Sequence, residues 1–124
     1  MPFSSIIPDH DQKLIISKAS GPMDAEIGKE FIAASRRKAS EYEYNILYDI
    51  RELDLDASIS DMYGLVKNLP EFQDNKSRHL KVALLISKET PRSDNFSFYE
   101  TAAQNEGLIV KLFMNEEEAM SWLK

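Results

Sequence analysis

Two oppositely charged residues near the end of a short apolar segment are the side chains best placed to do chemistry. Asp49 and Arg51 lie at the predicted carboxyl end of a strand over 45–50. In open α/β sheets, sites form at the carboxyl ends of the strands. Arg51 could bind an anion there, or the pair could bind a partner. One Asp and one Arg define no reaction, however, and we favour a simple ion pair.

Acidic residues are concentrated around this pair, and their carboxylate oxygens are ligands that Mg²⁺ accepts. The set comprises Asp49, Glu52, Asp54, Asp56 and Asp61. Their spacing does not match an EF-hand loop, which also requires a central glycine. We therefore interpret residues 51–57 as a solvated acidic loop and expect no bound metal.

The usual signals of nucleophilic catalysis are missing from the sequence. The chain has no cysteine, so disulfides and thiolate chemistry are excluded. No serine lies in a G-x-S-x-G elbow, and the two histidines, His10 and His79, fall in polar connections where we expect exposure. The four glycines are isolated, so they form no phosphate-binding loop. We predict a protein that is not an enzyme and has no cofactor.

Composition predicts one soluble domain spanning residues 1–124. Of these 124 residues, 43% are hydrophobic and 29% are charged. The net charge of −6 argues against nucleic acids and anionic membranes as partners, because both require a basic surface. The run Arg36-Arg37-Lys38 is interpreted as a solvated helix face. The sequence shows neither a signal peptide nor an apolar run of the ~20 residues that span a membrane, so we expect a cytoplasmic protein.

Hydrophobic patterning predicts five strands and four helices. The strands are expected over 3–7, 14–20, 45–50, 82–86 and 108–113, with Gly21-Pro22 ending the second and 82–86 as the central strand. The helices are expected over 24–40, 58–70, 96–106 and 115–123. Their N-caps are expected at Asp24, at Ser58 with Asp61, and at Asn115. The order β-β-α-β-α-β-α-β-α predicts an α/β fold with a mixed, mostly parallel sheet that begins with a hairpin.

Large apolar side chains on the second and third helices indicate a core and a further surface. Phe96, Phe98 and Tyr99 cannot share one helical face, so Phe98 is expected to be exposed or to cover something. Together with Met62 and Tyr63, it could line an apolar pocket or a homodimer contact. Gly64 lies inside a predicted helix, where we expect close packing to explain it.

Three segments together resemble a known family. They are Gly21-Pro22-Met23, Leu47-Tyr48-Asp49-Ile50-Arg51, and the tail Val110–Phe113 with Glu118–Leu123. They resemble the SpoIIAA-like family, a bacterial branch of STAS-like domains. The resemblance implies a sheet of four or five strands backed by helices, in a topology shared with anti-sigma-factor antagonists and lipid-binding CRAL-TRIO domains. It also implies a binding module for a small apolar ligand or a protein partner.

The same resemblance implies an alternative, regulatory function. Anti-sigma-factor antagonists carry a phosphorylatable serine, in a pattern like Asp-Ser-Ser-Gly, at the start of the helix that follows the central strand. Here the strand ends in Asp49-Ile50-Arg51-Glu52, and the first serines after it are Ser58 and Ser60. A phosphate is electrostatically favoured at a helix N-terminus. Ser58 and Ser60 are therefore the candidate phosphorylation sites, although the local motif is missing.

Overall fold

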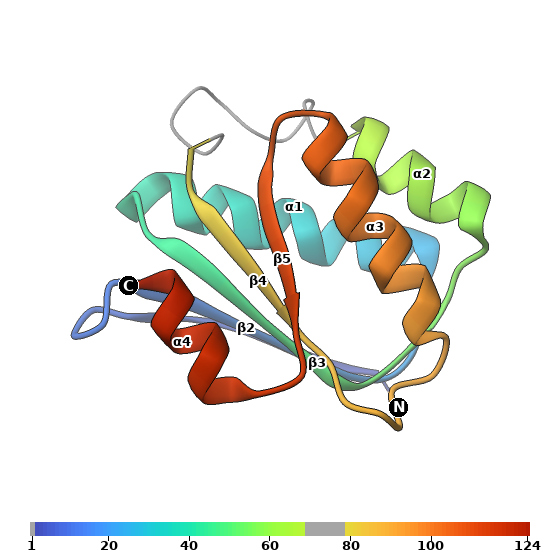
Figure 1. Ribbon diagram of the computed structural model, residues 1–124, viewed down its shortest axis with the longest axis horizontal. Helices are drawn as coiled ribbons and strands as arrows, with labels where there is room; N and C mark the ends of the chain where they lie inside the picture. The colour runs from blue at the N-terminus through green and yellow to red at the C-terminus, as the bar shows by residue number, and fades with distance from the viewer. Residues whose placement is uncertain (1, 69–78) are drawn as a thin grey trace.

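The computed structural model describes residues 2–68 and 79–124 and contains a five-stranded sheet (Figure 1). Its strands are β1 (Phe3–Asp9), β2 (Leu14–Asp24), β3 (Asn45–Asp56), β4 (Lys81–Leu85) and β5 (Ile109–Phe113). Its helices are α1 (Ala25–Tyr42), α2 (Ile59–Asn68), α3 (Ser93–Asn105) and α4 (Glu116–Leu123). The strands lie side by side in numerical order; β1 is antiparallel to β2, and the other neighbours are parallel. The predicted element order and mostly parallel sheet are confirmed.

Helices cover both faces of the sheet. Figure 1 shows α1, α2 and α3 on one side and α4 alone on the other. Successive side chains of a strand point to opposite faces, so β3 contributes to two cores. Ile46 and Tyr48 lie in the large core beneath α1–α3, whereas Leu47 lies in the smaller core beneath α4. Burial on both faces explains why the middle strands read as nearly continuous apolar runs.

The second and third strands are longer than the sequence predicts. β2 runs through Gly21 and Pro22, and β3 continues through the predicted acidic loop to Asp56. These extensions pair with each other, from Ser20 opposite Glu52 to Asp24 opposite Asp56. The predicted strand ends at 20 and 50 were therefore wrong. Pro22 is tolerated because it lies beyond the last residue that pairs with β1, so its missing N–H removes no bond to that strand.

The acidic stretch is an amphipathic strand and not a loop. Leu53 and Leu55 are buried in the large core, whereas Asp54 is only partly buried and Asp56 is exposed. This alternation has the period of two that defines a strand with one buried face. The Leu-Asp-Leu-Asp pattern was the available signal, and the density of acidic residues obscured it.

The central strand is β3, and the expectation that 82–86 occupies the centre was wrong. β4 lies between β3 and β5, one position from the edge of the sheet. Its sequence is uninterrupted in apolar residues because helices cover both of its faces. The same is true of its neighbour β3. Continuity of hydrophobic residues therefore measures burial and does not give a strand's position in the sheet.

The predicted caps at the starts of α1 and α2 are confirmed. Asp24 Oδ1 accepts a hydrogen bond from the N–H of Ile27 at 2.8 Å. At α2, Ser58 Oγ accepts from the N–H of Asp61 at 3.1 Å, and Asp61 Oδ2 accepts from the N–H of Ser58 at 3.0 Å. This reciprocal pair is a capping box. Pro70, the predicted end of the second helix, lies outside the described residues.

The closing helix α4 is fixed to the sheet by apolar and polar contacts. Asn115 caps its first turn, as predicted. The rings of Phe113 and Trp122 pack with their centroids 5.5 Å apart. At the far end, the Asn45 amide donates to the carbonyl of Leu123 at 2.8 Å. The tail thus seals the smaller core.

No helix within residues 2–68 and 79–124 is both long enough and apolar enough to cross a membrane.

Replacing Leu123 with alanine tests whether α4 contributes to stability. Leu123 is buried in the smaller core, so Leu123→Ala is expected to lower the free energy of unfolding by about 2–4 kcal/mol. Urea denaturation followed by circular dichroism measures the change. The exposed neighbour Lys124→Ala is the control and should shift stability by no more than ~0.5 kcal/mol. Equal stabilities for the two variants would contradict this account of α4.

Candidate ligand-binding site

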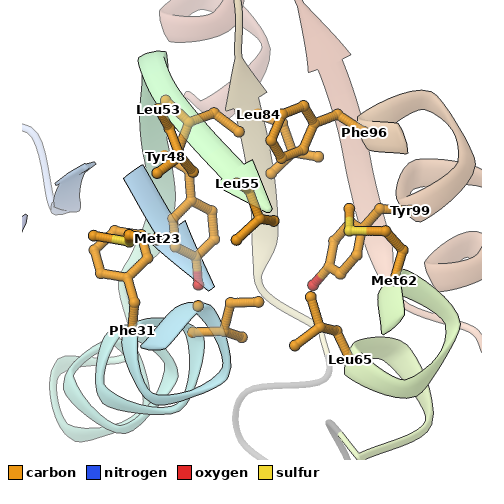
Figure 2. Close-up of a pocket in the computed structure, with 13 residues that line it drawn as sticks. Met23, Phe31, Tyr48, Leu53, Leu55, Met62, Leu65, Leu84, Phe96 and Tyr99 are labelled. Atoms are coloured by element: carbon orange, nitrogen blue, oxygen red, sulfur yellow. The ribbon is translucent and has the colours of Figure 1, made fainter. Parts of the chain in front are cut away.

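An apolar pocket lies between the sheet and helices α1, α2 and α3 (Figure 2). Its cavity measures about 40 Å³, and its walls are almost entirely apolar. The helices contribute six of the side chains that line it: Phe31 and Ile32 from α1, Met62 and Leu65 from α2, and Phe96 and Tyr99 from α3. A cavity of this size holds only a few atoms, since one water needs about 10–15 Å³ by the same kind of measure.

The extended parts of β2 and β3 supply three of the six sheet residues that line the pocket. Met23, Leu53 and Leu55 line it, and all three belong to the segments that continue beyond the predicted strand ends. Met23 faces Met62 of α2 across the pocket (Figure 2). Methionine side chains are unbranched and flexible, so they adapt to the shape of what they contact. These two side chains are therefore the most adaptable part of the pocket lining.

Gly28 sets how closely α1 approaches the floor of the pocket. It is buried, and a Cβ atom added there would lie 3.1 Å from Leu55 Cδ1. That distance is shorter than ordinary van der Waals contact, so an alanine at this position would push Leu55 toward the cavity. The absent side chain thus contributes directly to the open space.

Polar atoms gather at one end of the pocket. Figure 2 shows the hydroxyls of Tyr48 and Tyr99 pointing from the sheet and α3 toward the space between α1 and α2. Both side chains are buried, with relative exposures of 4% and 5%. Among the residues described, the Tyr48 hydroxyl has no hydrogen-bond partner of good geometry, although the Ser35 hydroxyl is close enough to lower its pKa. A buried hydroxyl in that state is energetically costly, so it merits an explanation.

Arg36 lies beside these hydroxyls. It follows Gly28 and Ile32 at intervals of one helical turn, so it continues the side of α1 that faces the pocket. Its exposure is 2%, whereas the adjacent Arg37 is exposed. The positive charge of Arg36 acts on both phenols and lowers their pKa values. Arg36 is thus a buried cation close to the two hydroxyls, although it does not itself line the pocket.

Burial keeps both phenols in the neutral state. Loss of solvation raises the pKa of Tyr48 and of Tyr99, and the charge of Arg36 only partly offsets that rise. A hydrogen bond of 2.8 Å between the fully buried Ser17 and Ser35 hydroxyls lies nearby, connecting β2 to α1. At neutral pH, therefore, the two phenols beside the pocket are both neutral hydroxyls.

Asp49 and Arg51 form a separate, polar cleft on the α4 side of the sheet. Arg51 Nε and Nη2 donate to the two carboxylate oxygens of Asp49 at 2.9 and 2.8 Å, and Nη2 is also 3.3 Å from Glu116. Burial alone would raise the pKa of Asp49, but the hydrogen bonds and charge of Arg51 outweigh it and lower the pKa. The pair lies within β3, at the level where β4 ends, and not at a strand end.

This cleft is poorly suited to binding an anion. It encloses about 630 Å³ and is lined by Glu52 and Glu89 as well as by Asp49, Arg51 and Lys18. Arg51 already binds two carboxylates, so an incoming anion would have to displace them. Among the described residues, no three His, Asp or Glu side chains converge as metal ligands would. The ion-pair interpretation of Asp49 and Arg51 therefore fits the geometry.

The remaining candidates are distributed over several surfaces. Met62 lines the apolar pocket, but Tyr63 is 49% exposed on α2 and does not line it. Phe98 is partly buried against the large core outside the pocket, where it covers the core edge. Ser58 and Ser60 are exposed at the start of α2. Of these residues, only Met62 lines the pocket. A homodimer contact through Tyr63 and Phe98 stays a prediction.

Two interpretations of the sequence were wrong, and one of them concealed a buried cation close to the pocket. The run Arg36-Arg37-Lys38 was assigned to a solvated face, but Arg36 is buried. The spacing of Gly28, Ile32 and Arg36 was the available signal. Gly64 was expected to permit close packing, yet an added Cβ there would meet nothing within 4 Å. His10 and His79, by contrast, are exposed as expected.

Comparisons with known proteins identify the fold. No protein-family model matches the chain, and no curated protein matches it significantly. Among solved structures, it is similar to the 2.25 Å crystal structure of an uncharacterised protein of the DUF3478 family, from Shewanella loihica PV-4, with a SpoIIAA-like fold. The TM-score is 0.56 and the identity 20%, over 99% of this chain and 94% of the other. The chain therefore has the SpoIIAA-like fold that the resemblance implied.

Replacing Tyr48 with phenylalanine tests the state of the buried hydroxyl. Because burial raises its pKa above the ordinary value of about 10, neutral Tyr48 supports stability fully below pH ~10 and less as the pH rises further. At pH 7, Tyr48→Phe should leave stability unchanged or raise it by up to ~1 kcal/mol, since it removes a hydroxyl without a described partner. Above pH ~10, the variant should lose less stability than the unmodified protein.

The measurement is urea denaturation between neutral and strongly alkaline pH. Tyr42→Phe, at a residue 36% exposed, is the control and should keep the alkaline loss of the unmodified protein. A large loss of stability in Tyr48→Phe at pH 7 would show that the hydroxyl is already engaged, contrary to this description.

Proposed function

We propose that this protein is a cytoplasmic, non-enzymatic binding module that holds a small apolar ligand between its sheet and helices α1–α3. The observation that carries the proposal is the cavity itself, which opens within the large core and is lined almost entirely by apolar side chains. Protein interiors are close-packed, so space of this kind beneath three helices is unusual. Empty apolar cavities remain dry and accept apolar molecules.

The size of the cavity limits the ligand. About 40 Å³ accommodates only part of a short aliphatic chain, and a longer one must displace the flexible side chains of Met23 and Met62. Each buried methylene stabilises the complex by about 0.8 kcal/mol. We therefore propose a short, unbranched aliphatic ligand. Its affinity should increase with chain length until the side chains of Met23 and Met62 can move no further out of the cavity.

The groups around the pocket support binding more than turnover. Tyr48 and Tyr99 are the tyrosines that line it, and burial keeps both neutral. Neutral phenols donate hydrogen bonds well but are weak acids and bases near pH 7. The ionisable pair Asp49 and Arg51 lies in a different cleft, so it does not act on the same ligand.

The apolar ligand can be tested with neutral alcohols and two matched glycine variants. Butanol, hexanol and octanol are titrated while the methyl signals of Met23 and Met62 are followed by NMR. Affinity should rise about fourfold per methylene, the equivalent of ~0.8 kcal/mol. Gly28→Ala should weaken binding at least about fivefold, because overfilling a packed site typically costs about 1–3 kcal/mol.

Gly64→Ala is the control for this experiment. Both glycines lie inside helices, so both substitutions gain roughly 0.5–1 kcal/mol of helix propensity. The added methyl at position 64 meets nothing within 4 Å, so alcohol affinity should not change. If no alcohol perturbs the two methionines, or if Gly28→Ala and Gly64→Ala bind equally, the pocket is not the ligand site.

A second candidate function is regulation through the start of α2. The observation that favours it is the exposure of Ile59 and Tyr63, at 47% and 49%, one helical turn apart. Exposed large apolar side chains that share a helix face are typical of partner-binding surfaces. Ser58 and Ser60 are exposed beside them. A phosphate on Ser58 would remove the Oγ that now accepts the N–H of Asp61 and would add charge at the edge of this surface.

Phosphorylation can be tested on protein isolated from its own cells. Under this candidate function, intact-mass and peptide mass spectrometry should find one phosphate on Ser58 or Ser60, and Ser58→Ala or Ser60→Ala should abolish it. Ser58→Ala should also cost about 1 kcal/mol through loss of the cap, whereas Ser60→Ala should not. Protein that carries no phosphate in any growth phase would argue against the regulatory function.

A further inference from the structure

We propose that β1 is a contact between two copies of this chain, which pair through this edge strand in antiparallel orientation with Ser5 on the two-fold axis. This inference goes beyond the proposed function, since it involves neither the apolar pocket nor its ligand. Three features of the described residues support it: the charge of the two sheet edges, the position of the exposed apolar side chains and the size of the surface they form.

The two edges of the sheet differ in charge. β1 and β5 are the edge strands, and an edge strand offers unpaired backbone N–H and C=O groups to another strand. Proteins usually protect such edges with charged side chains. β5 has the exposed Lys111 at its centre, so two copies paired about that residue would bring like charges together. The segment Phe3–Pro8 of β1, by contrast, carries no charge. β1 is therefore the less protected edge.

Exposed apolar side chains lie on one face of β1. Phe3, Ser5 and Ile7 share this face, because successive side chains of a strand alternate. Ile7 lies opposite Ile16 of β2, which packs against the smaller core, so this is the face that α4 covers farther along the sheet. At β1 the face is open, since Phe3 is 55% exposed and Ile7 is 59% exposed. Two uncovered apolar side chains thus stand on either side of Ser5.

A two-fold axis at Ser5 makes this strand complementary to itself. In a symmetric pair, residue i contacts residue j and j contacts i. With Ser5 opposite Ser5 of the second copy, Phe3 lies opposite Ile7 of that copy, and the contact occurs twice. Aromatic and β-branched side chains that lie directly opposite each other stabilise antiparallel pairs. Pro2 falls opposite Pro8, so the residues that lack an N–H bound the paired segment.

Helix α1 extends the same surface above β1. Tyr42 is 36% exposed, and the centroid of its ring lies 5.1 Å from that of His10, the residue that follows β1. Ile27 is 39% exposed on the same side of α1, about four turns earlier. The two-fold axis reverses α1 together with β1, so Ile27 approaches Tyr42 of the second copy. Of the eight large apolar side chains exposed among the described residues, four belong to this one surface: Phe3, Ile7, Ile27 and Tyr42.

The size of the surface is sufficient for a weak dimer. The seven residues of β1 span about 24 Å, and the 18 residues of α1 span about 27 Å. One layer of strands and one layer of helices are together about 20 Å thick. The surface therefore measures about 500 Å² on each copy, and the total of about 1,000 Å² is the lower bound for a specific interface. We expect a dimer that dissociates on dilution.

Analytical ultracentrifugation over a dilution series tests the dimer and its location. The unmodified chain should have twice the monomer mass at several hundred micromolar and approach the monomer mass on dilution. Ile7→Asp should raise the dissociation constant at least about tenfold, because it places an unpaired carboxylate against Phe3 of the second copy. Ile59→Asp is the matched control, since Ile59 is 47% exposed on α2, and it should change the constant by less than about twofold.

Cysteine cross-linking keeps the test decisive if Ile7→Asp does not fold. The chain has no cysteine of its own. In Ser5→Cys, the two cysteines lie directly opposite each other with their Cα atoms about 4.5–5.5 Å apart, a distance that a disulfide spans. In the control Ser4→Cys they are two residues out of register and about 7–8 Å apart, which is too far. With oxidised glutathione, Ser5→Cys should therefore form the covalent dimer at least about tenfold faster, although Ser4 is the more exposed residue.

Three results would overturn the proposal. The first is a chain that stays monomeric at every concentration. The second is a dimer that Ile7→Asp leaves intact, and its loss in Ile59→Asp would place the contact on α2 instead. The third is equal cross-linking of Ser5→Cys and Ser4→Cys, which would exclude pairing about Ser5. The alcohol titration is independent of all three, so the ligand-binding function is tested separately.

Discussion

The extended parallel pairing of β2 with β3 is the constraint on which the rest of the structure depends. These two strands remain paired to Asp24 and Asp56, whereas β3 and β4 separate after Asp49. Helices α1 and α2 therefore begin beyond the end of β4, and they have to cover a two-stranded extension with one apolar face. Met23, Leu53 and Leu55 supply that face, and all three line the pocket. The cavity thus follows from the unequal lengths of the strands, because three helices span an uneven floor.

The same extension separates two chemical environments. On the side of α1–α3 it is apolar and buried, whereas its acidic residues are directed outward. Asp54 pairs with Arg92, which anchors the loop before α3 to the strand. Arg51 is joined to Asp49 on one side and approaches Glu116 of α4 on the other. The charges that dominate the sequence of this stretch therefore stabilise connections between elements, and the less conspicuous leucines between them form the candidate site.

A few buried polar groups lie where α1 packs on β2. Ser17 and Ser35 hydrogen-bond to each other between β2 and α1, and Arg36 lies next to Ser35 on the helix. Polar groups in a core are costly unless they find partners, and networks of this kind often favour one arrangement over its alternatives. Here they orient α1 so that Gly28 and Ile32 face the floor of the pocket. Arg36 is therefore buried one turn beyond Ile32 on α1, outside the pocket lining.

The sequence by itself determined the order of the elements, the mostly parallel sheet and the helix caps, because these depend on local periodicity and on hydrogen bonds between near neighbours. It also placed Met62, Phe96 and Tyr99 on helices, but it could not bring them together around one cavity. Only the tertiary structure decided that β3 is central, that Leu53 and Leu55 continue a strand, and that Arg36 lies inside while Arg37 lies outside. The physical reason is that burial of a helix face and extension of a strand depend on what packs against them, and those partners are distant in sequence.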